Sequence, residues 1–514
     1  MKATLLWAAA ALISGFTLRR FVGPLDEGIL MQAATRMGDG QWPWRDFGWA
    51  YGPGEPLFVM VAGKLLGPSL LWWRLLRVAA DATAAVLVWA LVRDVRPRWA
   101  LPAWAAAAVT AAQPVSANPT APALALALAA VLLATRGRPA WAGLAAAGAA
   151  FFRPDVGVLA ALAAAAALAL AAREREAAGP GAGEGGEARA GRGESPSGAV
   201  ASGERRSGAA AAGGRRRRAG LPAAGIAIAV AALAGAALYA PFLVAASPAR
   251  VWDALVVQAG RDGAWWRLPF PPGYHGGDLK DFATWLAPYA ALLALVLAAL
   301  RPTRTAGLLI LGAGAAVYYR SRADLEHAQA LLVVAAGLAA LVRPKLAGAA
   351  ILALILAVGT ANRASALLRP PDLAPLGDVR VPPADAAAIP RVRRLVQRLV
   401  PPGEPIYVAP RRSDFVTFSN PLLHFLVDRP NVLHRDVLLQ AKPSEQARIV
   451  QALKAAKPKA IVRWTAPESA TPEPNRRGRP SGSTALDDYI DSAYRLEARY
   501  GDYEVLVPAQ DATQ

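Results

Sequence analysis

Long apolar runs, separated by short charged or proline-rich stretches, dominate residues 1–365. Many of these runs approach the roughly 20 residues that a helix needs to cross the hydrocarbon core of a bilayer. The pattern predicts a mainly α-helical, polytopic membrane bundle of about eleven helices. We expect them near 2–18, 69–92, 99–113, 119–135, 139–152, 155–172, 220–246, 284–300, 305–319, 324–342 and 346–364. At "FFRPDVG" (151–157) two helices meet, and one broken helix is the alternative.

Beyond residue 365 the pattern changes. The proline-rich stretch around "LLRPPDLAPLGDVRVPP" predicts a linker over 366–384. Residues 385–514 then combine short β-rich runs with one amphipathic segment, which predicts a small α/β domain. The expected strands are "PIYVA" (405–409), "KAIVRW" (459–464) and "YEVLVP" (503–508), and the expected helix is "PSEQARIVQALKAAKP" (443–458).

Composition and charge place the chain in a membrane. Hydrophobic residues make up 55% of the sequence, and the mean hydropathy is +0.29, values that a soluble protein of this size rarely reaches. The formal net charge of +19 comes largely from clusters between apolar runs. Because cytoplasmic loops concentrate Lys and Arg, the N-terminus is expected in the cytoplasm and the C-terminal domain on the periplasmic or extracellular side of the cell (inner) membrane. The basic loops are 93–98, 136–139, 173–219, 301–304 and 343–345.

Other classes are excluded or confined by the same data. The basic clusters follow membrane topology and no nucleic-acid-binding module is recognisable, so nucleic acid is not an expected partner. The sequence contains no cysteine, which excludes disulfides and thiolate chemistry. The Gly/Ala/Arg/Glu-rich stretch 173–219 is too poor in apolar side chains to order itself, and we expect a disordered cytoplasmic loop.

Charged residues gather at the outer ends of the predicted helices. Asp26 and Glu27 follow the first helix and open a short amphipathic segment, where a helix dipole favours negative charge. Further charges on the same face are Arg153 and Asp155 in "FFRPDVG", and Arg320, Arg322, Asp324 and His327 in "YYRSRADLEHAQA" (318–330). Arginine makes bidentate contacts with phosphate. The plain alternatives are a solvated helix start for the acids and snorkelling for the arginines.

Three stretches together carry a family resemblance. The acidic pair Asp26-Glu27, the segment "WRDFGWAYGPGEP" (44–56) and "RADLEH" (322–327) resemble the GT-C glycosyltransferases. These are multi-spanning enzymes similar to the bacterial aminoarabinose–lipid A transferase and the protein O-mannosyltransferases. The resemblance covers residues 1–365. It implies a GT-C-like fold, a polyprenyl-phosphate sugar donor and inversion at the anomeric carbon.

The resemblance also implies roles for individual residues. Asp26 is the expected general base on an acceptor hydroxyl, with Glu27 as its neighbour and substitute. Positive side chains are expected to bind the donor phosphate, which leaves as a dianion; the candidates are Arg320, Arg322, His327 and Arg153. Positioning of the loops or the substrate is expected from Arg45, Asp46, Tyr51, Asp155 and Asp324. Metal use differs among family members, so a divalent cation, Mg²⁺ or Mn²⁺, on Asp26 and Asp46 stays open.

The expected partners are membrane lipid, the polyprenyl-phosphate sugar donor, and a glycan, lipid or protein acceptor. A membrane transporter or lipid flippase is the competing class. Such proteins carry ionisable groups near mid-membrane and often show internal repeats, whereas this sequence shows no repeat and places its charges at one face. A non-catalytic membrane scaffold, whose outer domain binds a partner, is the third alternative.

Overall fold

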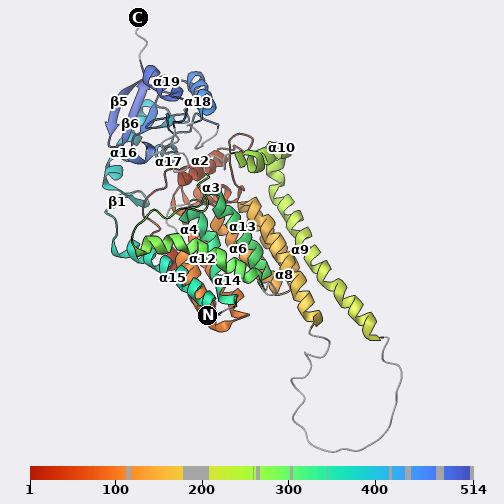
Figure 1. Ribbon diagram of the computed structural model, residues 1–514. Helices are drawn as coiled ribbons and strands as arrows, with labels where there is room; N and C mark the ends of the chain where they lie inside the picture. The colour runs from red at the N-terminus through yellow and green to blue at the C-terminus, as the bar shows by residue number, and fades with distance from the viewer. Residues whose placement is uncertain are drawn as a thin grey trace, which may run out of the picture.

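The computed structural model describes residues 1–111, 117–177, 208–258, 260–261, 267–300, 305–343, 345–415, 419–434, 442–470 and 480–509. Most of the predicted loop 173–219 lies outside these residues. Within them the chain forms a long helical bundle with a small α/β domain at one end (Figure 1). The fold class expected from the sequence, a mainly helical membrane protein with a C-terminal α/β domain, is confirmed.

A helix coincides with each of the eleven predicted crossings. Five of the described helices, or parts of them, are long and apolar enough to span a bilayer by length and composition: Leu71–Arg93, Pro154–Arg173, Pro222–Ala246, Leu279–Ala299 and Lys345–Leu368. Four others are apolar but shorter. The eleven helices that coincide with the predicted crossings are α1 (Lys2–Gly15), α4 (Leu71–Arg93), α5 (Pro97–Ala111), α6 (Thr120–Thr135), α7 (Pro139–Phe152), α8 (Pro154–Ala177), α9 (Gly208–Ala246), α12 (Leu279–Ala299), α13 (Ala306–Ser321), α14 (Leu325–Leu341) and α15 (Lys345–Leu368).

The chain breaks at Arg153. This residue adopts an extended conformation, with φ −143° and ψ 107°, as expected for a residue that precedes a proline. Helix α7 ends just before it, and α8 begins at Pro154 and packs back along α7. The "FFRPDVG" segment therefore joins two separate helices, and its Arg153 lies at the end of the bundle that carries the α/β domain.

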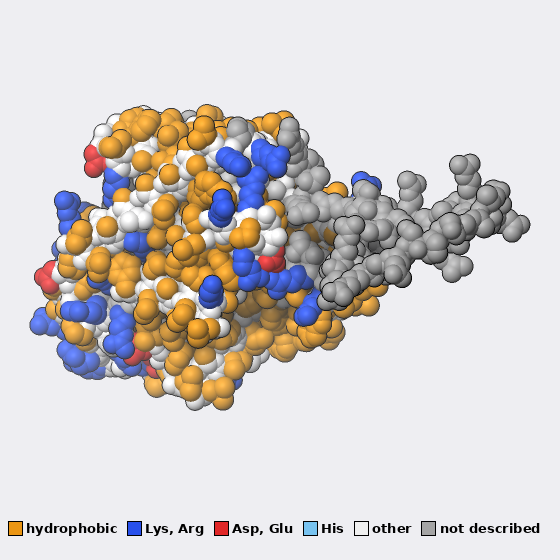
Figure 2. All heavy atoms as spheres, turned by 90° about the horizontal axis from the view of Figure 1, so that it is seen from below, with side chains coloured by type: hydrophobic (Ala, Val, Ile, Leu, Met, Phe, Trp, Pro, Cys, Tyr) orange, Lys and Arg blue, Asp and Glu red, His pale blue; other side chains and the backbone are white. Residues whose placement is uncertain are grey.

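Helix α14 forms the centre of the bundle. Every residue from Ala330 to Leu341 is buried, and the helix packs against α4, α5, α12, α13 and α15. Most of the buried side chains around it are alanine, valine and leucine. Small side chains allow helix backbones to approach closely where the hydrophobic effect contributes little. The many buried alanines thus form the surfaces through which the helices of the bundle pack together. Seen from the end opposite the α/β domain, Lys and Arg side chains are scattered among hydrophobic ones (Figure 2).

Two short helices lie between the bundle and the α/β domain. Helix α2 (Asp26–Gly38) is amphipathic as predicted, and α3 (Gly54–Leu66) follows it. The apolar residues Leu30 and Ala33 are 0% and 1% exposed, because α2 packs against α3 and against α17 (Leu422–Val427) of the α/β domain. The apolar side of α2 therefore faces protein. Two further short helices, α10 (Pro248–Trp252) and η1 (Asp253–Gln258), follow α9.

The α/β domain contains one four-stranded sheet in the order β3-β4-β6-β5. Strands β3 (Tyr407–Pro410) and β4 (Ile461–Trp464) are parallel, with Tyr407 opposite Ile461, while β6 (Tyr503–Pro508) runs antiparallel to both β4 and β5. All three predicted strands and the predicted helix, α18 (Pro443–Ala456), are present. The structure adds β5 (Tyr494–Tyr500), α16 (Pro383–Leu399), η2 (Pro467–Ala470) and α19 (Ala485–Ala493).

The segment predicted as a linker contains a hairpin. Strands β1 (Ala374–Leu376) and β2 (Val379–Val381) pair antiparallel. The Phe21 amide donates to the Arg380 carbonyl at 2.7 Å, and the Arg380 amide donates to the Arg19 carbonyl at 2.7 Å. The hairpin thus fastens the start of the α/β domain to the loop that follows α1.

Candidate active site at the domain-facing end of the bundle

Asp26 is the first residue of α2. It is an exposed residue, and its carboxylate makes no hydrogen bond or ion pair with any residue that the structure describes. Burial nevertheless raises the pKa of Asp26 to about 6, the Glu326 carboxylate adds to the rise, and His327 and Arg322 oppose it. The carboxylate is thus accessible to water while protein groups surround it. A pKa near 6 leaves it ionised and basic at neutral pH.

Glu27 has the opposite environment. It is 0% exposed, and Oε1 accepts hydrogen bonds from Trp73 Nε1 at 2.7 Å and Arg74 Nε at 2.9 Å. Oε2 accepts from Arg74 Nη2 at 3.0 Å and from the Gly23 amide at 2.8 Å. Arg74 also donates to the carbonyls of Leu18 and Phe21. The pair therefore fixes the loop after α1 to helix α4, and this geometry disfavours Glu27 as a substitute base.

The "RADLEH" segment joins α13 to α14 and is organised by Asp324. This carboxylate caps α14 by accepting from the His327 amide at 2.9 Å. It also contacts His327 Nδ1 at 2.7 Å and accepts from Arg322 Nε at 2.9 Å. An Nδ1–H that points at a carboxylate orients the ring and leaves Nε2 to face another group. Among the described residues Nε2 has no partner. Asp324 thus orients the side chains of Arg322 and His327.

Topology brings this segment to Asp26. Four charges of the segment, on Arg322, Asp324, Glu326 and His327, act on the Asp26 carboxyl. Glu326, which lies within "RADLEH" but was not a predicted site residue, exerts the strongest of these charge effects. Arg320 differs from its neighbours, because it is exposed in the last turn of α13 and forms no hydrogen bond or ion pair within the described part of the chain. It is also not among the charges that act most strongly on Asp26.

Arg153 lies next to this segment and is held by neighbouring side chains. Its Nε and Nη2 donate to Asp155 at 3.1 and 2.7 Å, and Nη1 donates to Thr120 Oγ1 at 2.7 Å. The guanidinium lies 4.3 Å from the centre of the Tyr318 ring, and that ring lies 4.9 Å from the His327 ring. Arg153 is 6% exposed. Its contacts commit it to Asp155, Thr120 and Tyr318, and through Tyr318 it supports His327.

The "YGPGEP" turn packs against the chain just before Arg153. The Gly52 amide donates to the Phe152 carbonyl at 3.0 Å, and a Cβ on Gly52 would lie 2.2 Å from the Phe151 carbonyl oxygen. Only glycine permits this approach. The turn holds the Tyr51 ring 5.8 Å from the Arg153 guanidinium. The neighbouring Trp44 and Trp49 are buried, and each donates to a backbone carbonyl of the same loop, so they stabilise the loop rather than present a surface to a sugar or to lipid.

Glu55, in the first turn of α3, is a second buried acid beside the site. It is 1% exposed, and its Oε2 is buried without a hydrogen-bond partner among the described residues. Burial raises the pKa of Glu55 to about 8; Arg77 lowers it and Asp26 raises it further. Glu55 is therefore largely protonated at neutral pH, which reduces charge repulsion with Asp26.

Arg45 and Asp46 lie apart from this cluster. Asp46 pairs with Arg45 at 2.7 Å and accepts from the Trp42 amide at 2.8 Å. These contacts with Arg45 hold the pKa of Asp46 below its ordinary value, and Asp46 is not among the charges that act most strongly on Asp26. No group of three or more His, Asp or Glu side chains in the described ranges could hold a metal ion. The geometry gives no support to a metal on Asp26 and Asp46.

No protein-family model and no curated protein matches the chain. Among solved structures, it is similar to ArnT from Cupriavidus metallidurans bound to undecaprenyl phosphate (TM-score 0.48, 15% identity, 99% of this chain and 98% of that chain). It is also similar to the arabinofuranosyltransferase AftD from Mycobacteria (0.46, 14%, 99% and 40%), and to ArnT from C. metallidurans in the apo state (0.37, 15%, 98% and 97%). At these sequence identities and TM-scores the similarity is one of backbone path alone, and it does not assign an activity to this chain.

Proposed function

We propose that the chain is an integral membrane glycosyltransferase, which transfers a sugar from a polyprenyl-phosphate donor to an acceptor hydroxyl at the end of the bundle that carries the α/β domain. One observation carries the proposal: the Asp26 carboxylate, which has no hydrogen-bond partner among the described residues, lies within reach of the charges of Arg322 and His327, whose side chains Asp324 orients. A base and groups that stabilise negative charge, side by side, are the two elements that transfer from a phosphate leaving group requires.

The residues divide the chemistry between them. Asp26 accepts the proton of the acceptor hydroxyl, and the hydroxyl oxygen attacks the anomeric carbon from the face opposite the leaving group. The bond between that carbon and the phosphate oxygen breaks, so the configuration inverts and polyprenyl phosphate leaves as a dianion. Arg322 and His327 stabilise the charge that develops on it, with Arg320 at the exposed rim.

Other predicted residues serve as positioning groups in this proposal. Asp324 orients Arg322 and His327, and Arg153, paired with Asp155, supports His327 through the Tyr318 ring. We assign residues 1–365 to the transferase region and residues 385–514 to a domain that handles the acceptor. For a cell membrane we propose that the N-terminus lies in the cytoplasm, because Lys and Arg concentrate in the loops that this orientation places there.

Sugar transfer in membranes that contain the overproduced protein tests the proposal. Radiolabelled mannosyl, glucosyl and arabinosyl polyprenyl phosphates would serve as donors, and wild type would be compared with Asp26→Asn. Asp39→Asn is the matched control, since Asp39 is an exposed residue at the other end of α2. We expect transfer by wild type and the control and loss of at least about 100-fold in Asp26→Asn. Equal transfer by both variants would exclude Asp26 as the base.

One observation favours transport as the second candidate. Asp81 lies about 15 Å along α4 from its first residue, accepts from Ser14 Oγ of α1 at 2.8 Å, and faces Arg77 Nε at 3.6 Å. Ionisable groups buried at such depth often lie on ion pathways. Proton or lipid translocation by proteoliposomes that show no sugar transfer with any of the donors would support this alternative.

A further inference from the structure

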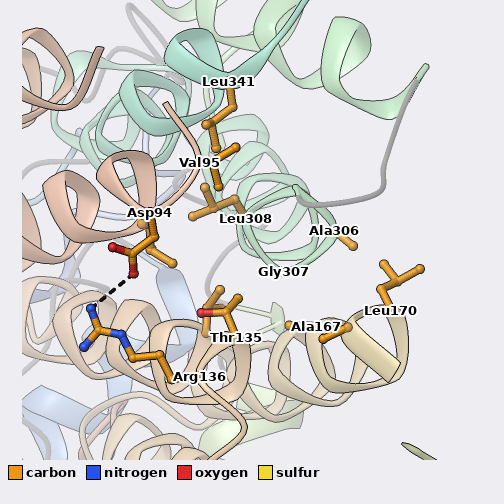
Figure 3. A pocket seen from close by; sticks show the side chains of 13 residues that line it. Asp94, Val95, Thr135, Arg136, Ala167, Leu170, Ala306, Gly307, Leu308 and Leu341 are labelled. Atoms are coloured by element: carbon orange, nitrogen blue, oxygen red, sulfur yellow. Dashed lines mark hydrogen bonds and ion pairs between the residues drawn. The ribbon is translucent and has the colours of Figure 1, made fainter. Parts of the chain in front are cut away.

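A cavity lies at the end of the bundle opposite Asp26. Its volume is about 240 Å³, and its lining residues come from or directly follow the ends of α4, α6, α8, α13 and α14 that lie away from the candidate active site. Figure 3 shows the lining side chains. The same helices α13, α14 and α8 begin or end near the candidate active site at their other ends. The cavity is therefore separated from that site by the length of the bundle, and sugar transfer does not account for it.

Most of the residues that line the cavity are aliphatic, and the polar ones are Asp94, Thr135 and Arg136. Its walls include aliphatic side chains from five helices: Leu91, Val131, Ala167, Leu170, Leu308 and Leu341. An apolar cavity of roughly 150 Å³ is large enough to bind benzene, so this one accommodates a stretch of alkyl chain. The surrounding bundle is closely packed, with alanines of 0% exposure throughout. The aliphatic ligand that a bilayer supplies at this position is a lipid chain.

Charged side chains lie at the edge of the cavity: Asp94 and Arg136 line it, and Arg93, outside the lining, pairs with Asp94. Arg136 donates to Asp94 at 3.2 Å, an interaction seen at the edge of the cavity in Figure 3, and Arg93 donates to the same carboxylate at 2.8 Å. Two guanidinium groups on one carboxylate leave a net positive charge. Both arginine side chains keep more than two-fifths of their surface exposed, 45% for Arg136 and 43% for Arg93, so they can turn toward a headgroup. Thr135 adds a hydroxyl to the lining.

We propose that this cavity binds one acyl chain of an anionic phospholipid from the leaflet that faces away from the α/β domain, with Arg136 and Arg93 at its phosphate. The aliphatic lining takes the chain, and the charge at the edge selects an anionic headgroup over a zwitterionic one, since arginine binds phosphate in a bidentate manner. The inference is independent of the proposed transferase activity, which belongs to the other end of the bundle.

Lipid retention by the full-length protein tests the inference. The protein would be purified in detergent with an equimolar mixture of dioleoyl phosphatidylglycerol and dioleoyl phosphatidylcholine, and bound lipid would be measured by native mass spectrometry. We expect wild type to retain phosphatidylglycerol over phosphatidylcholine by about fivefold or more. Ala167→Phe fills the cavity from α8 and should abolish this retention. Ala166→Phe, a neighbour on α8 that does not line the cavity, should retain it.

The proposed selection of an anionic headgroup has a separate test. Arg136→Gln should lower the preference for phosphatidylglycerol while leaving total bound lipid close to that of wild type. Ala306→Phe, which fills the cavity from α13, replaces Ala167→Phe if the latter elutes as an aggregate. Equal retention of both lipids by wild type, unchanged retention in the filled variants, or selective retention of added polyprenyl phosphate instead of phospholipid would each overturn the inference.

Discussion

Gly28 of α2 lies directly against the backbone of Leu422 in α17. A Cβ on Gly28 would come within 2.2 Å of the Leu422 amide nitrogen, and that amide donates to the Pro24 carbonyl at 3.2 Å. One turn further on, Gln32 Nε2 donates to the Pro421 carbonyl at 2.9 Å. The α/β domain thus packs tightly against α2. Asp26, the first residue of this helix, lies two residues before the contact at Gly28.

Gly28→Ala should displace α17 from α2, because the clash is with backbone atoms, which have little room to yield. We expect a loss of transfer activity of about tenfold or more, together with increased proteolysis between the bundle and the α/β domain. Gly38→Ala is the control, since the Cβ there would make ordinary contacts of 3.7 and 3.8 Å with flexible side chains of the same region. Equal behaviour of the two variants in the transfer assay would show that the contact does not position Asp26.

The pH dependence of transfer should report Asp26. Its pKa is raised to about 6, and only the ionised form accepts a proton. The rate should therefore rise with pH up to about 6 and level off above it. Glu326 contributes to the raised pKa, so Glu326→Gln should move the midpoint of the profile to lower pH. The measurement is kcat/KM between pH 4.5 and 8. A midpoint that does not move on this substitution would contradict the assignment.

Arg322 and Arg320 form a matched pair for the phosphate. Arg322 is oriented by Asp324 and acts on Asp26, whereas Arg320 is exposed. Removal of one preorganised donor from a transition-state charge costs about 100-fold or more in kcat. We expect a loss of this size for Arg322→Gln and less than about fivefold for Arg320→Gln, both measured by single-turnover transfer. The reverse order would place the donor phosphate at the rim.

Glu55 should make stability depend on pH. Its folded-state pKa is raised from 4.5 to about 8, so the unfolded chain ionises first as pH rises. The folded state therefore loses stability relative to the unfolded state between about pH 4.5 and 8. Glu55→Gln removes this loss. The difference in Tm between variant and wild type, measured by thermal unfolding from pH 5 to 8, should grow with pH in favour of the variant. A constant difference would mean that Glu55 is not protonated in the folded protein.

The sequence predicts the helices well because each apolar run is long and bounded by charge or proline. It also predicts that Asp26 and "RADLEH" share one face, since topology alone sets which helix ends meet. Strand β5 could not be predicted in the same way: "YRLEARY" lies at the sheet edge, and most of its residues remain exposed, so its pattern shows little alternation of burial.

Pairings between residues that are far apart in the sequence could not be predicted from it. Arg74 resembles any arginine near a helix end, and only the fold shows that it binds Glu27, 47 positions earlier. Likewise, Arg153 was expected at the donor phosphate because its charge faces the correct side. Asp155 and Thr120 occupy its donors instead. Charge and topology indicate where a side chain lies but not which neighbour it binds.

The pairing of Arg380 with the loop after α1, together with the tight packing of α17 against α2, also bears on how such a chain can change over evolutionary time. Residues 19–38 and the C-terminal domain share backbone hydrogen bonds and a glycine-dependent contact. Exchange of the C-terminal domain by recombination near residue 366 would separate surfaces fitted to one another. The two segments, more than 300 positions apart, are therefore expected to be inherited as one unit.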